Sequence, residues 1–76
     1  MTLRDTVEVN PSAMYAARVT RKLTLDDAAK ALGMSRTTLH AVESGRRPAA
    51  ENELERIAKL YRVKPAALAA ARAGKE

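Results

Sequence analysis

The chain has 76 residues, a length that forms one domain. It contains no cysteine, which excludes disulfides and thiolate metal sites and is compatible with a reducing, cytoplasmic setting. No run of residues approaches the roughly 18 apolar residues that a membrane-spanning helix needs, and the first ten residues lack the apolar stretch of a secretory signal.

The charge of the chain is the first indication of a partner. Lysine and arginine together number 14 against 9 acidic residues, which gives a net charge of +5 and an isoelectric point near 10.1. Such an excess attracts polyanions, either nucleic acid or an anionic membrane surface. The aromatic residues are Tyr15 and Tyr61 alone, which argues against single-strand binding, because single-strand binders stack bases on exposed aromatic rings. Duplex nucleic acid is therefore the better hypothesis.

Residues 1–9 precede the first predicted helix. Val7 and Val9 alternate with Thr6 and Glu8, a weak strand pattern. Because a lone strand needs a partner, this segment is expected either to be a flexible arm or to pair with another protomer. The sequence leaves both alternatives open.

Composition and helix signals predict an all-α fold, a compact bundle of five short helices. Ala, Leu, Lys, Arg and Glu are abundant, whereas Gly and Pro number three each, and this balance favours helices. The predicted helices lie within a domain of residues 10–72, and residues 73–76 are expected to be a frayed tail. The helices cover residues 11–22, 25–32, 36–44, 51–61 and 65–72.

Polar caps mark the starts of the first three helices. Asn10 is a good N-cap, and Pro11, the next residue, suits the first helical position. Thr24 caps the second helix, with Asp27 at the third helical position in a variant of the capping box. Ser35 caps the third helix in the same way.

Apolar residues recur at spacings of three and four and predict the faces that pack. The second helix ends at Gly33, where a left-handed residue costs little, and the third begins three residues later. So short a connection makes the two helices cross at a steep angle, with the small Ala29 where their backbones approach. The apolar positions are Met14, Ala17, Leu25, Ala28, Ala29, Leu32, Leu39, Val42, Leu54, Ile57, Ala58, Tyr61 and Leu68.

Residues 24–48, TLDDAAKALGMSRTTLHAVESGRRP, resemble the helix-turn-helix of the bacterial and phage repressor family. That family includes the lambdoid phage repressors, Cro and the xenobiotic-response-element regulators. The features that carry the resemblance are Ala29, Gly33 and Ser35, the string VESGRRP at 42–48 and the string IAKLYRV at 57–63. Together they cover about residues 10–68, most of the chain.

The resemblance implies that residues 36–44 form a recognition helix, which reads base edges in the major groove with its N-terminal residues. The base-reading positions it implies are Arg36, Thr37, His40 and Ala41. Arg36 is the strongest candidate, because a guanidinium can bond guanine O6 and N7 together. Its alternative role is a phosphate contact, which gives affinity without sequence choice.

Phosphate contacts are implied on both sides of the recognition helix. In the family the loop after this helix grips the sugar-phosphate backbone, and here that loop holds Arg46 and Arg47. Thr24, Thr38 and Ser44 are expected to donate neutral hydrogen bonds to phosphates. The family often has a polar residue at the start of the second helix; this chain has Leu25, which removes one expected contact.

Arg18 and Glu43 are expected to form a structural ion pair. The family often pairs an arginine of its first helix with a glutamate near the end of the recognition helix, and these residues occupy those positions. Such a pair would hold the first helix against the third. A direct role in DNA binding is not expected for Glu43, because its carboxylate would repel phosphate.

The sequence therefore predicts sequence-specific binding of double-stranded DNA by a transcriptional regulator, a repressor. Two alternatives stay open: an antitoxin that also neutralises a toxin protein and regulates its own operon, and the DNA-binding module of a longer metallopeptidase-type regulator. The chain is expected to be bacterial or phage-encoded and associated with the nucleoid in the cytoplasm. A toxin protein is the further partner that the antitoxin alternative implies.

Enzymatic activity is not expected. The sequence shows no catalytic nucleophile paired with a general base, no glycine-rich loop that could bind a phosphate and no histidine or cysteine cluster for a metal. No cofactor is expected either. Because one such module makes a small interface with DNA, a homodimer on DNA is predicted, formed through residues 65–72 or the N-terminal arm.

Overall fold

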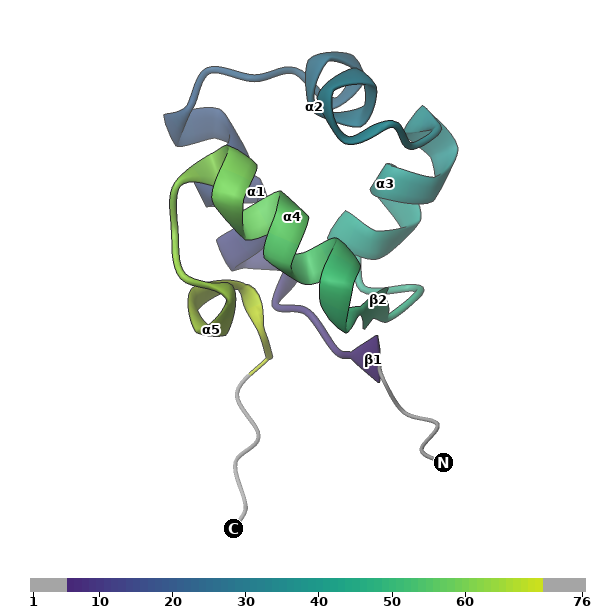
Figure 1. The fold of residues 1–76 in the computed structure, drawn as a ribbon, viewed down its shortest axis with the longest axis vertical. Coiled ribbons are helices and arrows are strands. Elements are labelled where there is room, and N and C mark those ends of the chain that lie inside the picture. The colour runs from purple at the N-terminus through teal and green to yellow at the C-terminus, as the bar shows by residue number, and fades with distance from the viewer. Residues whose placement is uncertain (1–5, 71–76) are drawn as a thin grey trace, which may run out of the picture.

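The computed structural model describes residues 6–70 of the chain. It confirms the expected compact bundle of five helices that contains a helix-turn-helix, and it adds a pair of two-residue strands (Figure 1). The elements in chain order are β1 (Thr6–Val7), α1 (Pro11–Thr20), α2 (Leu25–Leu32), α3 (Arg36–Glu43), β2 (Ala49–Ala50), α4 (Glu51–Tyr61) and α5 (Pro65–Leu68).

The caps of the first three helices are hydrogen-bonded as the sequence predicts. The Asn10 side chain accepts from the Ala13 amide at 3.2 Å, and the Ser35 hydroxyl accepts from the Thr38 amide at 3.0 Å. At the start of α2 the Thr24 hydroxyl accepts from the Asp27 amide at 3.0 Å, and the Asp27 carboxylate accepts from the Thr24 amide at 3.3 Å. These bonds satisfy amides that have no partner within their own helix.

The turn between α2 and α3 fixes a steep crossing of the two helices. Gly33 has φ +70°, a left-handed conformation that stops α2 and lets the chain reverse into α3. In Figure 1 α2 is seen nearly along its axis while α3 runs across the picture. Ala29 is 3% exposed and leaves room for the close approach. Arg56 of α4 donates to the Leu32 carbonyl and so caps the end of α2.

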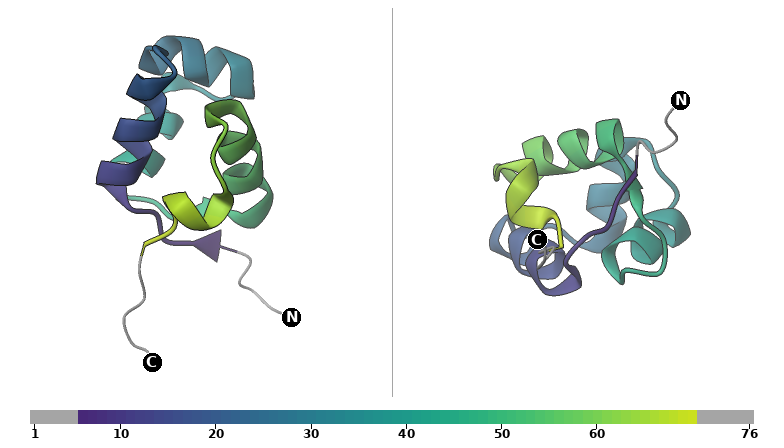
Figure 2. Two further views of the ribbon diagram at one scale, coloured as in Figure 1. Left: turned by 90° about the vertical axis from the view of Figure 1, so that its left-hand side faces the viewer. Right: turned by 90° about the horizontal axis from the view of Figure 1, so that it is seen from below.

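The core lies between the helices and includes side chains from all five. α1 and α4 flank it on two sides, with α2 across one end (Figure 2). Its aliphatic and aromatic members are almost fully removed from solvent. They are Val9, Met14, Ala28, Ala29, Leu32, Leu39, Val42, Ala49, Leu54, Ile57, Ala58, Tyr61 and Leu68. Each larger aliphatic side chain in such a core contributes roughly 1.5 to 3 kcal/mol relative to exposure.

The N-terminal segment behaves differently from both sequence-based alternatives. β1 pairs antiparallel with β2 of the same chain, Thr6 opposite Ala50 and Val7 opposite Ala49. Val9 then forms a bridge with Ala69. Residues 6–9 therefore pair inside their own protomer, which neither a flexible arm nor pairing with another protomer anticipates. Residues 1–5 lie outside the described residues.

Three predicted helices end earlier than expected. α1 ends at Thr20 and not at residue 22, because Lys22 takes a left-handed φ of +58°. α3 ends at Glu43, with Ser44 as its C-cap. α5 ends at Leu68 and not at residue 72, because Ala69 is extended with ψ 148° and bridges to Val9. Residues 71 and 72 of that prediction, and the expected tail at 73–76, lie outside the described residues.

Candidate nucleic-acid interface

The outer face of α3 carries the polar side chains predicted to read bases. Arg36, Thr37 and His40 are exposed, and Ala41 is half-buried beside them. These residues fall on one side of the helix because their spacing follows the helical period of 3.6 residues. The opposite side of α3 is buried and holds Leu39, Val42 and Glu43. The predicted base-reading positions therefore share one face, on a helix whose other face is held by the core.

Arg36 forms an ion pair that the sequence analysis did not predict. Its Nε lies 3.4 Å from Oδ1 of Asp26, and the side chains are 68% and 72% exposed. The sequence explains Asp26 through the dipole of α2, where a carboxylate in the first turn is favourable. The pair forms because α2 and α3 cross after the turn at Gly33, so that Asp26 in the first turn of α2 lies within reach of the Arg36 side chain. An ion pair this exposed contributes little to stability.

The three hydroxyl groups predicted to contact phosphates already take part in local hydrogen bonds. Thr24 and Thr38 act as acceptors, Thr24 from the Asp27 amide and Thr38 from the Ser35 hydroxyl at 2.8 Å. Each of these two keeps its own hydroxyl hydrogen. The Ser44 hydroxyl donates to the Ala41 carbonyl at 3.3 Å, so a phosphate would have to replace that bond.

The two arginines of the loop after α3 have different surroundings. Arg46 is exposed, and its side chain has no hydrogen bond or ion pair within residues 6–70. Arg47 is half-buried, and its Nη1 lies 3.4 Å from Oε1 of Glu53. The same oxygen accepts from the Ala50 amide at 3.0 Å, which caps α4. Arg46 is therefore the less constrained cation of the loop.

A buried ion pair holds α3 against α1. Arg18 Nε lies 3.1 Å from Glu43 Oε1, Nη2 lies 3.1 Å from Oε2, and Nη1 donates to the Leu23 carbonyl at 2.8 Å. The two side chains are only 12% and 9% exposed. The guanidinium also lies over the Tyr15 ring, 5.3 Å from its centroid, a cation–π contact. The hydrogen bond to Glu43 raises the pKa of Arg18 above its ordinary value.

Comparison with known proteins agrees with this geometry. A family model described as helix-turn-helix domain matches residues 15–71. The chain belongs to this helix-turn-helix family, of the Cro-like and xenobiotic-response-element type. Membership implies DNA binding and a role in transcriptional regulation. No match was found among curated proteins or among solved structures.

In this helix-turn-helix domain, Leu25 occupies the place where the family often has a polar residue. Its side chain is half-buried and packs against the core. It also forms one wall of a shallow pocket of about 230 Å³ between the start of α2 and the outer face of α3. The other walls are Arg36, Thr37 and His40. The pocket thus lies among three of the predicted base-reading residues, which periodicity alone does not reveal.

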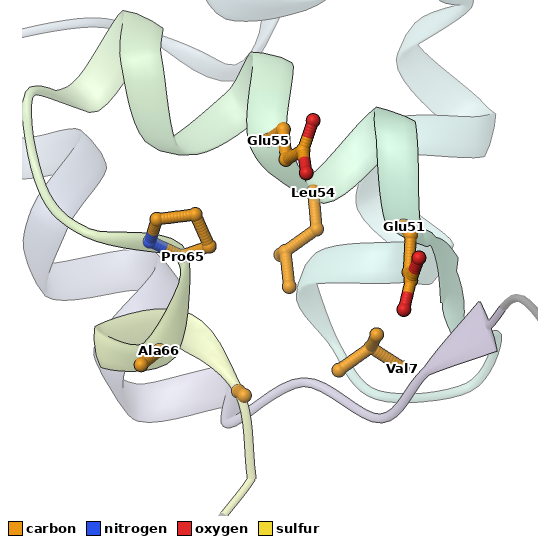
Figure 3. A pocket seen from close by; sticks show the side chains of 7 residues that line it. Val7, Glu51, Leu54, Glu55, Pro65 and Ala66 are labelled. Carbon is orange, nitrogen blue, oxygen red and sulfur yellow. The ribbon is translucent and has the colours of Figure 1, made fainter.

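A second hollow of about 280 Å³ lies where β1, α4 and α5 meet (Figure 3). Apolar side chains form most of its wall, and two carboxylates lie on α4 beside it. Residues of the N-terminal segment and of the last helix, the two predicted dimer elements, both line it. Its lining residues are Val7, Glu51, Leu54, Glu55, Pro65, Ala66 and Ala69.

Two further observations concern other kinds of site. Within residues 6–70 no helix has the length and apolar character needed to cross a bilayer. No group of three or more His, Asp or Glu side chains that could hold a metal ion occurs in the same part of the chain.

Proposed function

We propose that this domain binds a specific duplex DNA sequence by inserting α3 into the major groove. The observation that carries the proposal is the division of α3 into two faces. Leu39, Val42 and Glu43 anchor one face in the protein, while Arg36, Thr37 and His40 leave the other open. The major groove of B-DNA admits one α-helix, and its base edges are distinguishable there.

In this proposal Arg36 provides the main base contact. Asp26 engages its Nε and leaves the two terminal nitrogens to donate to guanine O6 and N7. A bidentate contact of this kind is worth about 1 to 3 kcal/mol of discrimination against the wrong base. Thr37 and His40 contact the neighbouring base edges, and Ala41 touches a thymine methyl group.

Contacts to phosphates position the helix in the groove. Arg46 is proposed as the principal phosphate contact, since its side chain is exposed, and Arg47 as the second. Thr24 and Thr38 donate their free hydroxyl hydrogens, and Ser44 joins them after giving up its bond to the helix. Such contacts carry no sequence information themselves but fix the register of the protein on the duplex.

We infer that the domain acts as a repressor and binds DNA as a homodimer. A protein seated in the groove excludes other proteins from the same base pairs, so a site that overlaps a promoter would be silenced. The dimer is proposed to form through the face where β1 and α5 meet. A dimer reads two half-sites centred about one helical turn apart. Sedimentation of the complex, and a reporter gene with the site placed over its promoter, test these two points.

The antitoxin alternative remains a separate prediction. It implies a toxin protein encoded beside this chain, and co-purification of the two gene products would test it. The proposed DNA contacts apply in either case, because an antitoxin of this kind also regulates its own operon.

The experiment that tests base reading is selection of bound duplexes from a random pool, with Arg36→Ala in parallel. The wild-type protein is expected to enrich one motif that contains a guanine at a fixed position. The variant should lose preference at that guanine and keep it elsewhere. Uniform weakening across all sequences would assign Arg36 to a phosphate instead. Enrichment of no motif by the wild type would contradict sequence-specific binding.

A further inference from the structure

The pocket between α2 and α3 combines one apolar wall with three polar ones. Leu25 contributes an apolar wall, Thr37 a side chain with a methyl group and a hydroxyl, and His40 an imidazole ring. Arg36, Thr37 and His40 can each donate a hydrogen bond to an acceptor, whereas the Leu25 side chain has no donor and offers only an apolar surface. The walls suit a small apolar group that lies next to a hydrogen-bond acceptor.

Leu25 is held in place by the structure around it. It is the first residue of α2, directly after the Thr24 cap that is bonded to Asp27. Its side chain is half-buried against the core. The apolar wall therefore exists before any ligand arrives, and little conformational entropy is lost when a group packs on it.

Arg36 supplies the neighbouring hydrogen-bond donors. Its Nε is engaged by Asp26 at 3.4 Å, so the edge that carries the two terminal nitrogens is the one left for a ligand. This edge matches guanine O6 and N7. Adjacent base pairs are about 3.4 Å apart along the duplex, so a group that packs on Leu25 beside that edge would belong to a base pair next to the guanine.

We propose, building on the DNA-binding function above, that this pocket receives the 5-methyl group of a pyrimidine next to the guanine contacted by Arg36. The methyl group is the one apolar feature that base pairs display in the major groove, and among the four standard bases thymine alone carries it. 5-Methylcytosine carries the same group on the same ring carbon. The domain therefore distinguishes methylated from unmethylated cytosine at this position.

The test uses the duplex selected by the wild-type protein and removes one methyl group at a time. Each thymine is replaced singly by deoxyuridine, which keeps every hydrogen-bonding group. Replacement at the thymine beside the guanine is expected to weaken binding about fourfold, the equivalent of about 0.8 kcal/mol for one buried methyl group. In a duplex with cytosine at the same place, 5-methylcytosine should bind about fourfold tighter than cytosine.

Protein variants then test whether the difference between the thymine and deoxyuridine duplexes depends on the pocket. Leu25→Ala is expected to bind the thymine and deoxyuridine duplexes equally, because the apolar wall is gone. Leu60→Ala is the matched control: this half-buried leucine lies on α4 beside Ala31 and Lys59, and its variant should retain the fourfold difference. Because deoxyuridine changes only the DNA, the first comparison holds even if a variant folds poorly.

Two results would overturn the pocket assignment while the proposed function stands. One is unchanged binding for deoxyuridine at every thymine, together with loss of guanine preference in Arg36→Ala. The other is a fourfold methyl effect that survives Leu25→Ala. Failure of the wild-type protein to bind any duplex would instead contradict the proposed function itself.

Discussion

The inner and outer faces of α3 each carry an ion pair, one buried and one exposed to solvent. On the inner face Glu43 is 7% exposed and accepts three hydrogen bonds of 3.1 to 3.3 Å from Arg18. On the outer face Arg36 meets Asp26 at 3.4 Å, with both side chains mostly in solvent. The inner pair is fixed because a buried charge without a partner is costly. The outer pair is weak and involves only the Nε of Arg36, so the two terminal nitrogens stay available for contacts with DNA.

This difference separates stability from binding within one short helix. Changes on the inner face should lower the free energy of unfolding and affect DNA binding only through the folded fraction. Changes on the outer face and in the adjoining loop should alter DNA binding and leave unfolding almost unchanged. The predictions that follow test this division from both sides.

The largest effect is expected for Glu43→Ala. The variant leaves the Arg18 guanidinium largely buried without its carboxylate, which should lower the free energy of unfolding by about 3 to 5 kcal/mol. Urea unfolding followed by circular dichroism measures the change. For a domain this small, such a loss removes a large share of the total stability.

The double variant Arg18→Ala/Glu43→Ala provides the control for that result. If the two residues act as a pair, the double variant should lose less than the sum of the two single losses. Strictly additive losses would show that the two side chains contribute independently.

Arg46→Ala tests the outer region through the salt dependence of DNA binding. Loss of one phosphate contact should make the slope of log K (the association constant) against log salt concentration less steep by about 0.9. At 0.1 M salt this corresponds to binding that is weaker by a factor of about 8. Fluorescence anisotropy at several salt concentrations measures it. Lys59→Ala removes one positive charge from α4 and should leave the slope unchanged. An equal change in both variants would indicate an effect of net charge alone.

A smaller change, in the opposite direction, is expected for Tyr61→Phe. The Tyr61 side chain is 1% exposed, and its hydroxyl has no hydrogen-bond partner within residues 6–70. Removing a buried unpaired hydroxyl should raise the free energy of unfolding by up to about 1 kcal/mol. Tyr15→Phe, at an exposed ring, should change it by less than about 0.5 kcal/mol. Destabilisation by Tyr61→Phe would show that the hydroxyl has a partner.

Tyr61 is also expected to make the folded protein less stable at high pH. Burial, with a further contribution from the charge of Glu43, raises the pKa of Tyr61 to about 12, above the value near 10 of an unfolded tyrosine. The stability that depends on protonated Tyr61 is fully present below pH 10. It is lost as the pH rises towards 12, because the unfolded chain releases the tyrosine proton at a lower pH than the folded chain does. Wild-type protein should therefore lose stability relative to Tyr61→Phe above pH 10. Parallel unfolding curves for the two proteins over this range would contradict the assignment.

Local signals account for the parts of the fold that the sequence predicts well. The bounds of α2 and α4 match the predicted ranges, and α3 differs by one residue. Thr24, Ser35 and Gly33 act through bonds and backbone angles within a few residues of themselves. The Arg18–Glu43 contact could be expected only from the resemblance to the family, since these residues are 25 positions apart.

The parts that the sequence does not predict depend on contacts between distant segments. Ala49 and Ala50 have low strand propensity, yet they pair with β1 because the end of α3 and its loop bring them beside Thr6 and Val7. α5 ends after one turn because the Leu68 carbonyl accepts from the Asn10 amide and the Ala70 amide donates to the Glu8 carbonyl, which places Ala69 opposite Val9. The pocket at Leu25 and the Asp26–Arg36 pair likewise exist only once the two helices have crossed.

The most direct test of the central claim is a titration of isotope-labelled protein with duplex DNA at low salt, followed through its backbone amide signals. The account predicts that the largest shifts fall on Arg36, Thr37 and His40, with smaller shifts around Arg46. Amides of α5 should stay in place on a single half-site. Amide signals of α3 that do not move when duplex is added would contradict the account.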